Sequence, residues 1–250
     1  MIELDVADGV AWLRLARPEA LNALDRALTT ALESALERVA TMDDVVVLVV
    51  AGRGRAFCAG NDLREMATLT REEAEALARR QAALMDRFAR LPQVTMAAID
   101  GYALGGGCML AVAQDLRIAS DRARFGLPEV TLGFNPAYGI ARLLDVAGGG
   151  HARDLLLTGR TIRASDALRM GLVNRVVAPP TLEASAAAWA AEIARVPRAG
   201  LAAAKQIVAA IRSGSPGREP EAFGAALTEG AAAREKIRAF AGRKRRDPAD

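Results

Sequence analysis

The chain has 250 residues, of which 52% are hydrophobic and 25% are charged, with one histidine and two cysteines. A structural zinc site needs four closely spaced Cys or His ligands, so His151, Cys58 and Cys108 are too few, and we expect no metal site. Two cysteines cannot build a disulfide scaffold, and a Ser–His–Asp or Cys–His hydrolase would depend on His151 alone. The length suits one large domain, or one domain with an appendage.

The N-terminal stretch MIELDVADG has neither the basic nor the apolar region of a signal peptide. The chain contains no run of 18 apolar residues, so we expect no membrane span and a reducing cytoplasmic location. The formal net charge is +3, and part of the basic excess lies at the C-terminus, in Arg243, Lys244, Arg245 and Arg246. Such a cluster is either a solvated tail or a site for a phosphate or a nucleic acid.

The first hundred residues alternate between strand and helix patterns. Asp8-Gly9 is typical of a hairpin turn, and apolar residues three or four positions apart, from Leu28 to Val39, predict a helix. The unbroken apolar run Val45 to Val50 suits a strand buried on both faces. The expected elements are strands 3–6, 10–15 and 45–50, a charged helix 71–90 and a buried strand 94–99.

The second part of the chain changes character after Pro179-Pro180. A glycine-rich turn at 101–107 opens a helix of small residues, and strands are expected at 116–119, 123–125 and 172–177. Residues 182–212 are Ala-rich and helical with a break near Val196-Pro197, a linker follows at 213–220, and one last helix is expected over 221–241. The order of elements predicts an α/β fold with parallel sheets, followed by a helical appendage.

Two glycine-containing segments follow buried strands. AFCAGNDLREM at 56–66 has a tight Ala59-Gly60 turn before Asn61-Asp62, which is typical of a helix start whose free N–H groups point at an acceptor. GYALGGGCML at 101–110 carries three consecutive glycines, which is costly unless the backbone approaches a ligand or a neighbouring strand closely. The second segment is neither a dinucleotide fingerprint nor a phosphate-binding P-loop. The first also fits an ordinary strand-to-helix loop with a capping residue, and the second also fits simple packing.

Glu129 lies in a third segment, FGLPEVTLGFNPAYGIARL at 125–143, among Phe125, Leu127, Val130 and Leu132. Apolar surroundings disfavour the charged form of a carboxyl group and raise its pKa. That shift suits a general acid–base near neutral pH. A surface or capping role for Glu129 fits this segment equally well.

These segments together resemble the enoyl-CoA hydratase/isomerase (crotonase) family. The resemblance includes ARPEALNAL at 16–24, the three segments above, LLLTGRTIRASDALRMGLVNRVV at 155–177 and the ending AFAGRKRRDP, so it covers nearly the whole chain. It implies an α/β, crotonase-like (ClpP/crotonase) spiral of ββα units with a C-terminal helical trimerisation region. Residues 1–190 would form the core with the acyl-CoA site. Residues 191–250 would serve oligomerisation and contacts with the CoA phosphates.

The resemblance also implies roles for particular residues. The backbone N–H groups of Asn61 and Gly106 would bind the thioester oxygen and stabilise an enolate, and each such donor contributes about 3 kcal/mol to transition-state stabilisation. Glu129 would be the acid–base. The CoA moiety would contact Ala20, Leu21, Ala23, Ala59, Gly60, Asp62 and Leu63, the acyl pocket would contain Met66, Met109, Leu132 and Tyr138, and Lys236, Arg243 or Lys244 could meet the phosphates. No cofactor beyond the CoA of the substrate is expected, and the partner would be a second and third copy of the chain, as a homotrimer or hexamer.

The sequence departs from the family pattern at Met109, where typical hydratases carry a second glutamate. Adding water needs one group to activate the water and one to deliver a proton, whereas a single carboxylate can move a proton between C2 and C4 of a 3-enoyl-CoA. The first hypothesis is therefore an isomerase. A hydratase that uses Tyr138 or another group is the rival, and thioester hydrolysis or decarboxylation also fits an oxyanion hole.

A binding protein is the hypothesis from a different class. It would be an inactive acyl-CoA sensor, or an RNA binder that uses the basic tail. Aromatic residues make up only 4% of the chain, and no base-stacking pattern is visible, so we expect no nucleic-acid partner.

Overall fold

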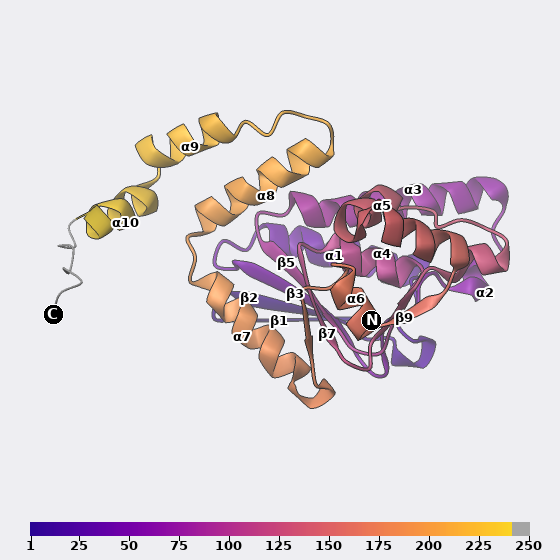
Figure 1. Ribbon diagram of the computed structural model, residues 1–250. Helices are drawn as coiled ribbons and strands as arrows, with labels where there is room; N and C mark the ends of the chain where they lie inside the picture. The colour runs from indigo at the N-terminus through magenta and orange to yellow at the C-terminus, as the bar shows by residue number, and fades with distance from the viewer. Residues whose placement is uncertain (242–250) are drawn as a thin grey trace.

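The computed structural model describes residues 1–241, in which two β-sheets are flanked by helices (Figure 1). The basic residues 243–246 lie outside the described residues. They include Arg243 and Lys244, two of the candidate phosphate contacts. None of the helices that the structure describes combines the length and the apolar character that crossing a membrane requires.

The larger sheet has six strands in the order β1-β2-β3-β5-β7-β10. β1 and β2 form an antiparallel hairpin in which Ala7 pairs with Val10, and every other pairing in this sheet is parallel. All six residues of β5 are buried, as the apolar run 94–99 predicted. The strands are β1 (Ile2–Ala7), β2 (Val10–Leu15), β3 (Val47–Gly52), β5 (Val94–Ile99), β7 (Leu116–Ser120) and β10 (Arg175–Val177).

The smaller sheet has four strands of three residues each, in the order β4-β6-β8-β9. Of these strands, the sequence predicted only β8. The other three were missed because a three-residue strand is too short to show a hydrophobic period. Three of these strands lead directly into the segments at 59–66, 105–113 and 127–132. The bounds are β4 (Ala56–Cys58), β6 (Tyr102–Leu104), β8 (Arg124–Gly126) and β9 (Thr161–Arg163).

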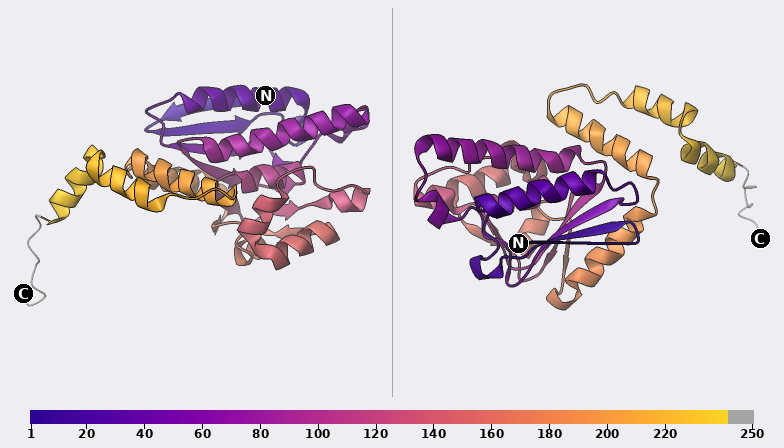
Figure 2. Two further views of the ribbon diagram at one scale, coloured as in Figure 1. Left: turned by 90° about the horizontal axis from the view of Figure 1, so that it is seen from above. Right: turned by 180° about the vertical axis from the view of Figure 1, so that it is seen from behind.

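Helices cover both faces of the larger sheet (Figures 1 and 2). On one face, α1 (Arg26–Ala40), α3 (Arg71–Arg90), α4 (Gly106–Ala113) and α5 (Ile140–Thr158) enclose the main core. On the other face, α7 (Leu182–Ala194) packs its alanine side against β3 and β5. All eight residues of α4 are buried, which is typical of a helix that is apolar all round.

The C-terminal helices extend away from the body of the molecule (Figures 1 and 2). α8 (Arg198–Arg212) still contacts α3 and β5, whereas α9 (Glu219–Thr228) and α10 (Ala231–Ala241) lie further out. The prediction of one helix over 221–241 is wrong, because one helix ends at Thr228 and the next begins at Ala231. Gly230 lies at this break, and glycine is a poor helix former because it loses the most backbone freedom. The division into residues 1–190 and 191–250 stays a prediction.

Candidate active site

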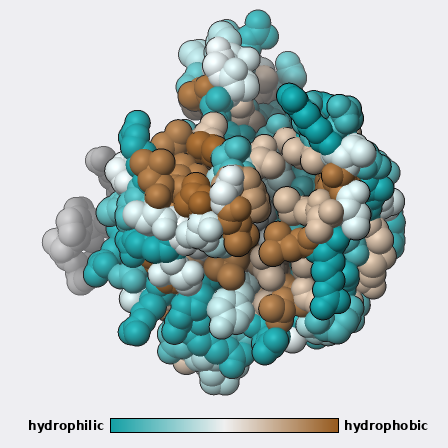
Figure 3. Space-filling model, turned by 90° about the vertical axis from the view of Figure 1, so that its right-hand side faces the viewer, coloured by the Kyte–Doolittle hydropathy of each residue, from teal (hydrophilic) through white to brown (hydrophobic). Residues whose placement is uncertain are grey.

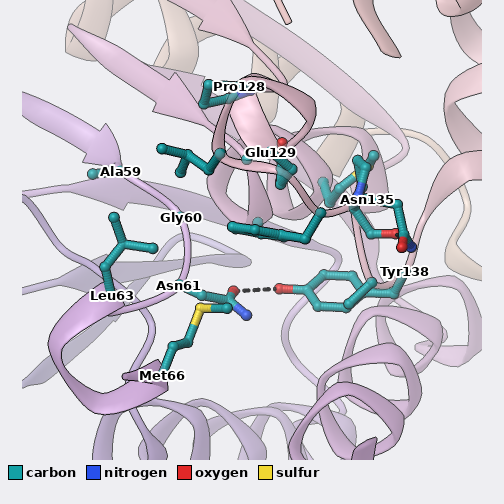
Figure 4. Close-up of a pocket in the computed structure, with 16 residues that line it drawn as sticks. Ala59, Gly60, Asn61, Leu63, Met66, Pro128, Glu129, Asn135 and Tyr138 are labelled. Carbon is teal, nitrogen blue, oxygen red and sulfur yellow. Dashed lines mark hydrogen bonds between the residues drawn. The ribbon is translucent and has the colours of Figure 1, made fainter. Parts of the chain in front are cut away.

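Three chain segments meet around a cavity of about 120 Å³ (Figure 4). One segment follows β4, one follows β6 and opens α4, and one runs from β8 into α5. The first segment includes the short helix α2 (Leu63–Met66), and the third includes the 3-10 helix Pro128–Leu132. The lining residues are Ala59, Gly60, Asn61, Leu63, Met66, Gly105, Gly106, Met109, Pro128, Glu129, Leu132, Phe134, Asn135, Pro136, Ala137 and Tyr138.

The first two segments touch each other through their backbones. Gly60 has a φ of +99°, and a Cβ atom there would lie 2.8 Å from the carbonyl oxygen of Leu104 and 3.2 Å from the nitrogen of Gly106. A side chain at residue 60 would therefore separate the two strand ends. Asp62 caps the following helix, since its carboxylate accepts hydrogen bonds from the N–H groups of Arg64 and Glu65.

Neighbouring atoms approach each glycine of the triplet too closely for a side chain to fit. A Cβ on Gly105 would lie 2.8 Å from Glu129 Oε1, and a Cβ on Gly106 would lie 2.5 Å from Asn61 Oδ1 and 2.6 Å from the Tyr138 hydroxyl. A Cβ on Gly107 would lie 2.0 Å from the carbonyl oxygen of Cys58. The lack of side chains at 105 and 106 thus leaves the space in which polar groups from the other two segments meet.

Two backbone donors are free in this space. Within residues 1–241, the N–H groups of Asn61 and Gly106 have no hydrogen-bond acceptor. Gly106 is the first residue of α4, so its N–H has no partner inside the helix. Two free N–H groups on adjacent segments form an arrangement that can bind an oxyanion.

Glu129 is the one carboxylate among the described residues that line the cavity. Its side chain comes from the 3-10 helix and points toward the cavity (Figure 4), and the residue is 9% exposed. Its Oε2 atom has no hydrogen-bond partner within residues 1–241. Burial raises the pKa of this carboxyl group above its ordinary value. A buried carboxylate with a free oxygen atom can accept and return a proton.

A chain of side-chain hydrogen bonds fixes Asn61. The Tyr138 hydroxyl donates to Asn61 Oδ1 at 2.9 Å (Figure 4), and Asn61 Nδ2 donates to Gln81 Oε1 at 2.9 Å. Burial raises the pKa of Tyr138, so the phenol keeps its proton. The sequence reasoning missed Gln81, although its position between Leu77 and Leu84 on the buried face of α3 could have indicated it.

Met109 occupies the position where the family pattern expects a second glutamate. It is 1% exposed, and its Sδ atom would lie 2.8 Å from a Cβ on Gly139. A thioether carries no exchangeable proton. Cys58 and Cys108 are also buried, and burial raises the pKa of each thiol to about 12, so neither is a thiolate near neutral pH.

The predicted site residues fall into two groups. Ala59, Gly60, Asn61, Leu63, Met66, Gly106, Met109, Glu129, Leu132 and Tyr138 line the cavity. Ala20, Leu21, Ala23 and Asp62 do not line it, but they lie beside it, because the Ala59 N–H donates to the Leu21 carbonyl at 3.0 Å and the Asp62 N–H to the Leu24 carbonyl at 3.0 Å.

Arg17 joins these two strips of chain, and the sequence reasoning missed it. Its guanidinium donates to the Ala23 carbonyl at 3.0 Å and to Asp62 Oδ2 at 2.9 Å. Lys236 lies in α10, on the far side of the molecule from α2 (Figures 1 and 2).

The mouth of the cavity is apolar. Leu63, Leu132 and Phe134 line it and remain 55%, 56% and 37% exposed. Figure 3 shows the side of the molecule that carries α2 in Figure 1, where hydrophobic side chains gather among hydrophilic ones. Within residues 1–241, no cluster of His, Cys, Asp or Glu could hold a metal ion.

Comparison with known proteins agrees with the family resemblance of the sequence. The family model described as enoyl-CoA hydratase/isomerase matches residues 5–245. A Mycobacterium avium protein named "Probable enoyl-CoA hydratase echA17" is 41% identical over 204 residues, which cover 81% of this chain and 79% of the relative. An enoyl-CoA hydratase structure from Bacillus anthracis has a TM-score of 0.89 at 33% identity and covers 96% of this chain and 95% of that one. The structure of Pseudomonas aeruginosa DspI has a TM-score of 0.90 at 31% identity, covering 96% and 93%.

Proposed function

The chain belongs to the enoyl-CoA hydratase/isomerase family, and from this premise we propose that it moves the double bond of a 3-enoyl-CoA to the 2-position. Enzymes of this family act on acyl-CoA substrates. The observation that carries the choice of reaction is that Glu129 is the one carboxylate among the described lining residues, with Met109 where the family resemblance predicts a second acid.

The proposed reaction uses the groups in the cavity as follows. The thioester oxygen accepts hydrogen bonds from the N–H groups of Asn61 and Gly106. The Glu129 carboxylate removes a proton from C2, the electrons move into the thioester as an enolate, and the two N–H groups stabilise its negative charge. Glu129 then returns the proton to C4, the double bond forms between C2 and C3, and the carboxylate is regenerated.

The raised pKa of Glu129 supports this cycle. A base works best when its pKa lies near the operating pH, because it must take up a proton and release it again. Burial moves the Glu129 pKa in that direction. The unpartnered Oε2 atom also leaves one oxygen available for the substrate proton.

Hydration of a 2-enoyl-CoA is the second candidate. The relatives are named hydratases, and the Tyr138 hydroxyl lies beside Asn61 and Gly106, where a second group could assist water. The Tyr138 hydroxyl already donates its hydrogen bond to Asn61, and burial raises its pKa above the ordinary value, so the phenol stays protonated and cannot take a proton from water.

One experiment separates the two candidates. The purified protein is given a 3-enoyl-CoA in one reaction and a 2-enoyl-CoA in another, and the products are identified by mass and chromatography. We expect the 2-enoyl isomer to form faster than the 3-hydroxyacyl product. A faster hydration of the 2-enoyl-CoA would make the protein a hydratase.

The remaining expectations belong to the same proposal. The segments around Ala20 to Ala23 and Ala59 to Asp62 would hold the CoA moiety, since they lie side by side next to the cavity. Lys236, in α10, and the basic residues after 241 would meet CoA phosphates, and the chain would assemble as a homotrimer or hexamer. The location would be cytoplasmic.

A further inference from the structure

A second cavity lies behind the wall that Met109, Ala137 and Tyr138 form. These three residues line both the site cavity of about 120 Å³ and a neighbouring cavity of about 580 Å³. The larger cavity lies between α3, α5 and α8, from which most of its lining residues come. The wall is thin, because the same side chains face both spaces.

The site cavity is too small to bury an acyl chain alone. Pockets that bury a small-molecule ligand typically have volumes of about 300–1,000 Å³, and the second cavity provides the missing volume. Met109 is unbranched and flexible, so a change of its rotamer can open a passage between the two spaces. The apolar part of its lining includes Ala82, Met85, Ala89 and Ala141.

The lining of the second cavity also carries positive charge. Arg90, Arg142 and Arg212 line it, and Asp86 is the one acidic residue among the described lining residues. Asp86 is already bound to Arg142, at 3.1 Å. Arg142 is buried and also donates to the backbone carbonyls of Met85 and Ala113, so its donors serve the fold.

Arg90 and Arg212 are the two available cations. Neither side chain forms an ion pair or a hydrogen bond within residues 1–241, and both residues are exposed. Burial, with the nearby charge of Arg212, lowers the pKa of Arg142 to about 10. This mutual repulsion of guanidinium groups would be relieved by a bound anion.

We propose that the second cavity receives the far end of the acyl chain and that its arginines bind a carboxylate there. The substrate class is thus a CoA monothioester of a dicarboxylic acid. The thioester would lie in the site cavity, the methylene chain would pass the Met109–Tyr138 wall, and the terminal carboxylate would meet Arg90 and Arg212. This proposal rests on the proposed function only in that the acyl group enters from the Glu129 cavity.

Binding of saturated thioesters tests the proposal without any turnover. Adipoyl-CoA and suberoyl-CoA are compared with hexanoyl-CoA and octanoyl-CoA, which have the same carbon numbers and no terminal carboxylate, by calorimetry on the full chain. We expect the ω-carboxy thioesters to bind about three- to tenfold more tightly, which corresponds to the net contribution of about one hydrogen bond, because the two arginines are exposed to solvent. The preference should shrink as the salt concentration rises.

Variants locate the carboxylate. Arg90→Gln and Arg212→Gln should each reduce the preference, and the double variant should abolish it while leaving hexanoyl-CoA binding unchanged. Arg38→Gln is the matched control, because Arg38 is also exposed and lies in the last turn of a helix, but it lines neither cavity.

Two outcomes would overturn the proposal. Equal affinity for the two series would mean that Arg90 and Arg212 do not bind the terminal carboxylate. A change of assembly mass in the double variant, without loss of the preference, would place them in a subunit interface instead. The result is independent of the reaction catalysed, because a protein that proves to be a hydratase would still show or lack the preference.

Discussion

Glu129 is a buried ionisable residue, and its burial affects the stability of the fold. A carboxyl group whose folded pKa lies above its unfolded value opposes folding once it ionises. At pH values below the ordinary pKa of 4.5, both states carry the proton and the group has no effect. The opposing effect develops as the pH rises through the folded pKa and persists at neutral pH.

We therefore expect Glu129→Gln to stabilise the protein at pH 7, by about 0.5–2 kcal/mol. The gain should vanish as the pH falls toward 4.5, because the wild-type carboxyl group is then neutral too. Urea unfolding of both proteins across this pH range measures the difference. An equal or lower stability of the variant at pH 7 would contradict the burial of an ionisable Glu129.

Tyr138 offers a second prediction at the residue scale. Tyr138→Phe removes the hydrogen bond to Asn61 Oδ1, and a neutral hydrogen bond contributes about 0.5–1.5 kcal/mol. We expect kcat/KM for the 3-enoyl-CoA to fall about three- to tenfold, because in the proposed reaction Asn61 also supplies an oxyanion donor. Tyr102→Phe is the control, since Tyr102 is 43% exposed and outside the cavity. A loss of all activity in Tyr138→Phe would instead make the phenol a catalytic group.

At the scale of elements, the start of α4 determines the shape of the site. Gly106→Ala would bring a methyl group within 2.5 Å of Asn61 Oδ1 and 2.6 Å of the Tyr138 hydroxyl. Both neighbours are side-chain atoms rather than backbone, so the clash can be relieved by breaking the Tyr138–Asn61 hydrogen bond. We therefore expect the fold to survive and acyl-CoA binding to be lost. Thermal unfolding and calorimetry measure the two effects.

Gly150→Ala in α5 is the matched control for this variant. A Cβ there would meet no atom within 4 Å, so the substitution should stabilise the helix by about 0.5–1 kcal/mol and leave binding intact. Normal binding by Gly106→Ala would show that the space beside Asn61 is not used by the substrate.

The elements also show what the sequence could reveal. α3 was predicted with its true bounds, because its charged and apolar faces alternate over 20 residues and Leu91-Pro92 ends it. The strands β4, β6 and β9 were not predicted, since each has only three residues and forms through pairing with neighbouring strands. The placement of Glu129 in the cavity was predicted from its apolar neighbours, whereas Gln81 and Arg17 reach the site through contacts 20 and 45 residues away in the sequence, at Asn61 and Asp62.

At the scale of the whole molecule, the C-terminal helices carry unpacked apolar side chains. Phe223 and Phe240 are 66% and 78% exposed, and Ile237 is 51% exposed. An isolated chain gains nothing from such exposure, since burying apolar surface contributes about 25 cal/mol per Å². We expect these helices to pack against other copies of the chain.

The predicted assembly has three times the chain mass, or six times if two trimers pair. Sedimentation or light scattering measures this directly. The double variant Phe223→Asp, Ile237→Asp should shift the assembly toward the monomer, while Val6→Asp, which changes an exposed residue of β1, should not. A monomeric wild-type protein at micromolar concentration would contradict the assembly.

The central claim is that Glu129 alone carries the proton between C2 and C4. Its most direct test is the rate at which wild type and Glu129→Gln convert a 3-enoyl-CoA into the 2-enoyl isomer, with binding of a saturated acyl-CoA as the check that the site is intact. Removing a general base typically costs about 10²–10⁴ in rate, and we predict a loss of this size in kcat with unchanged binding. Undiminished isomerisation by Glu129→Gln would contradict the account.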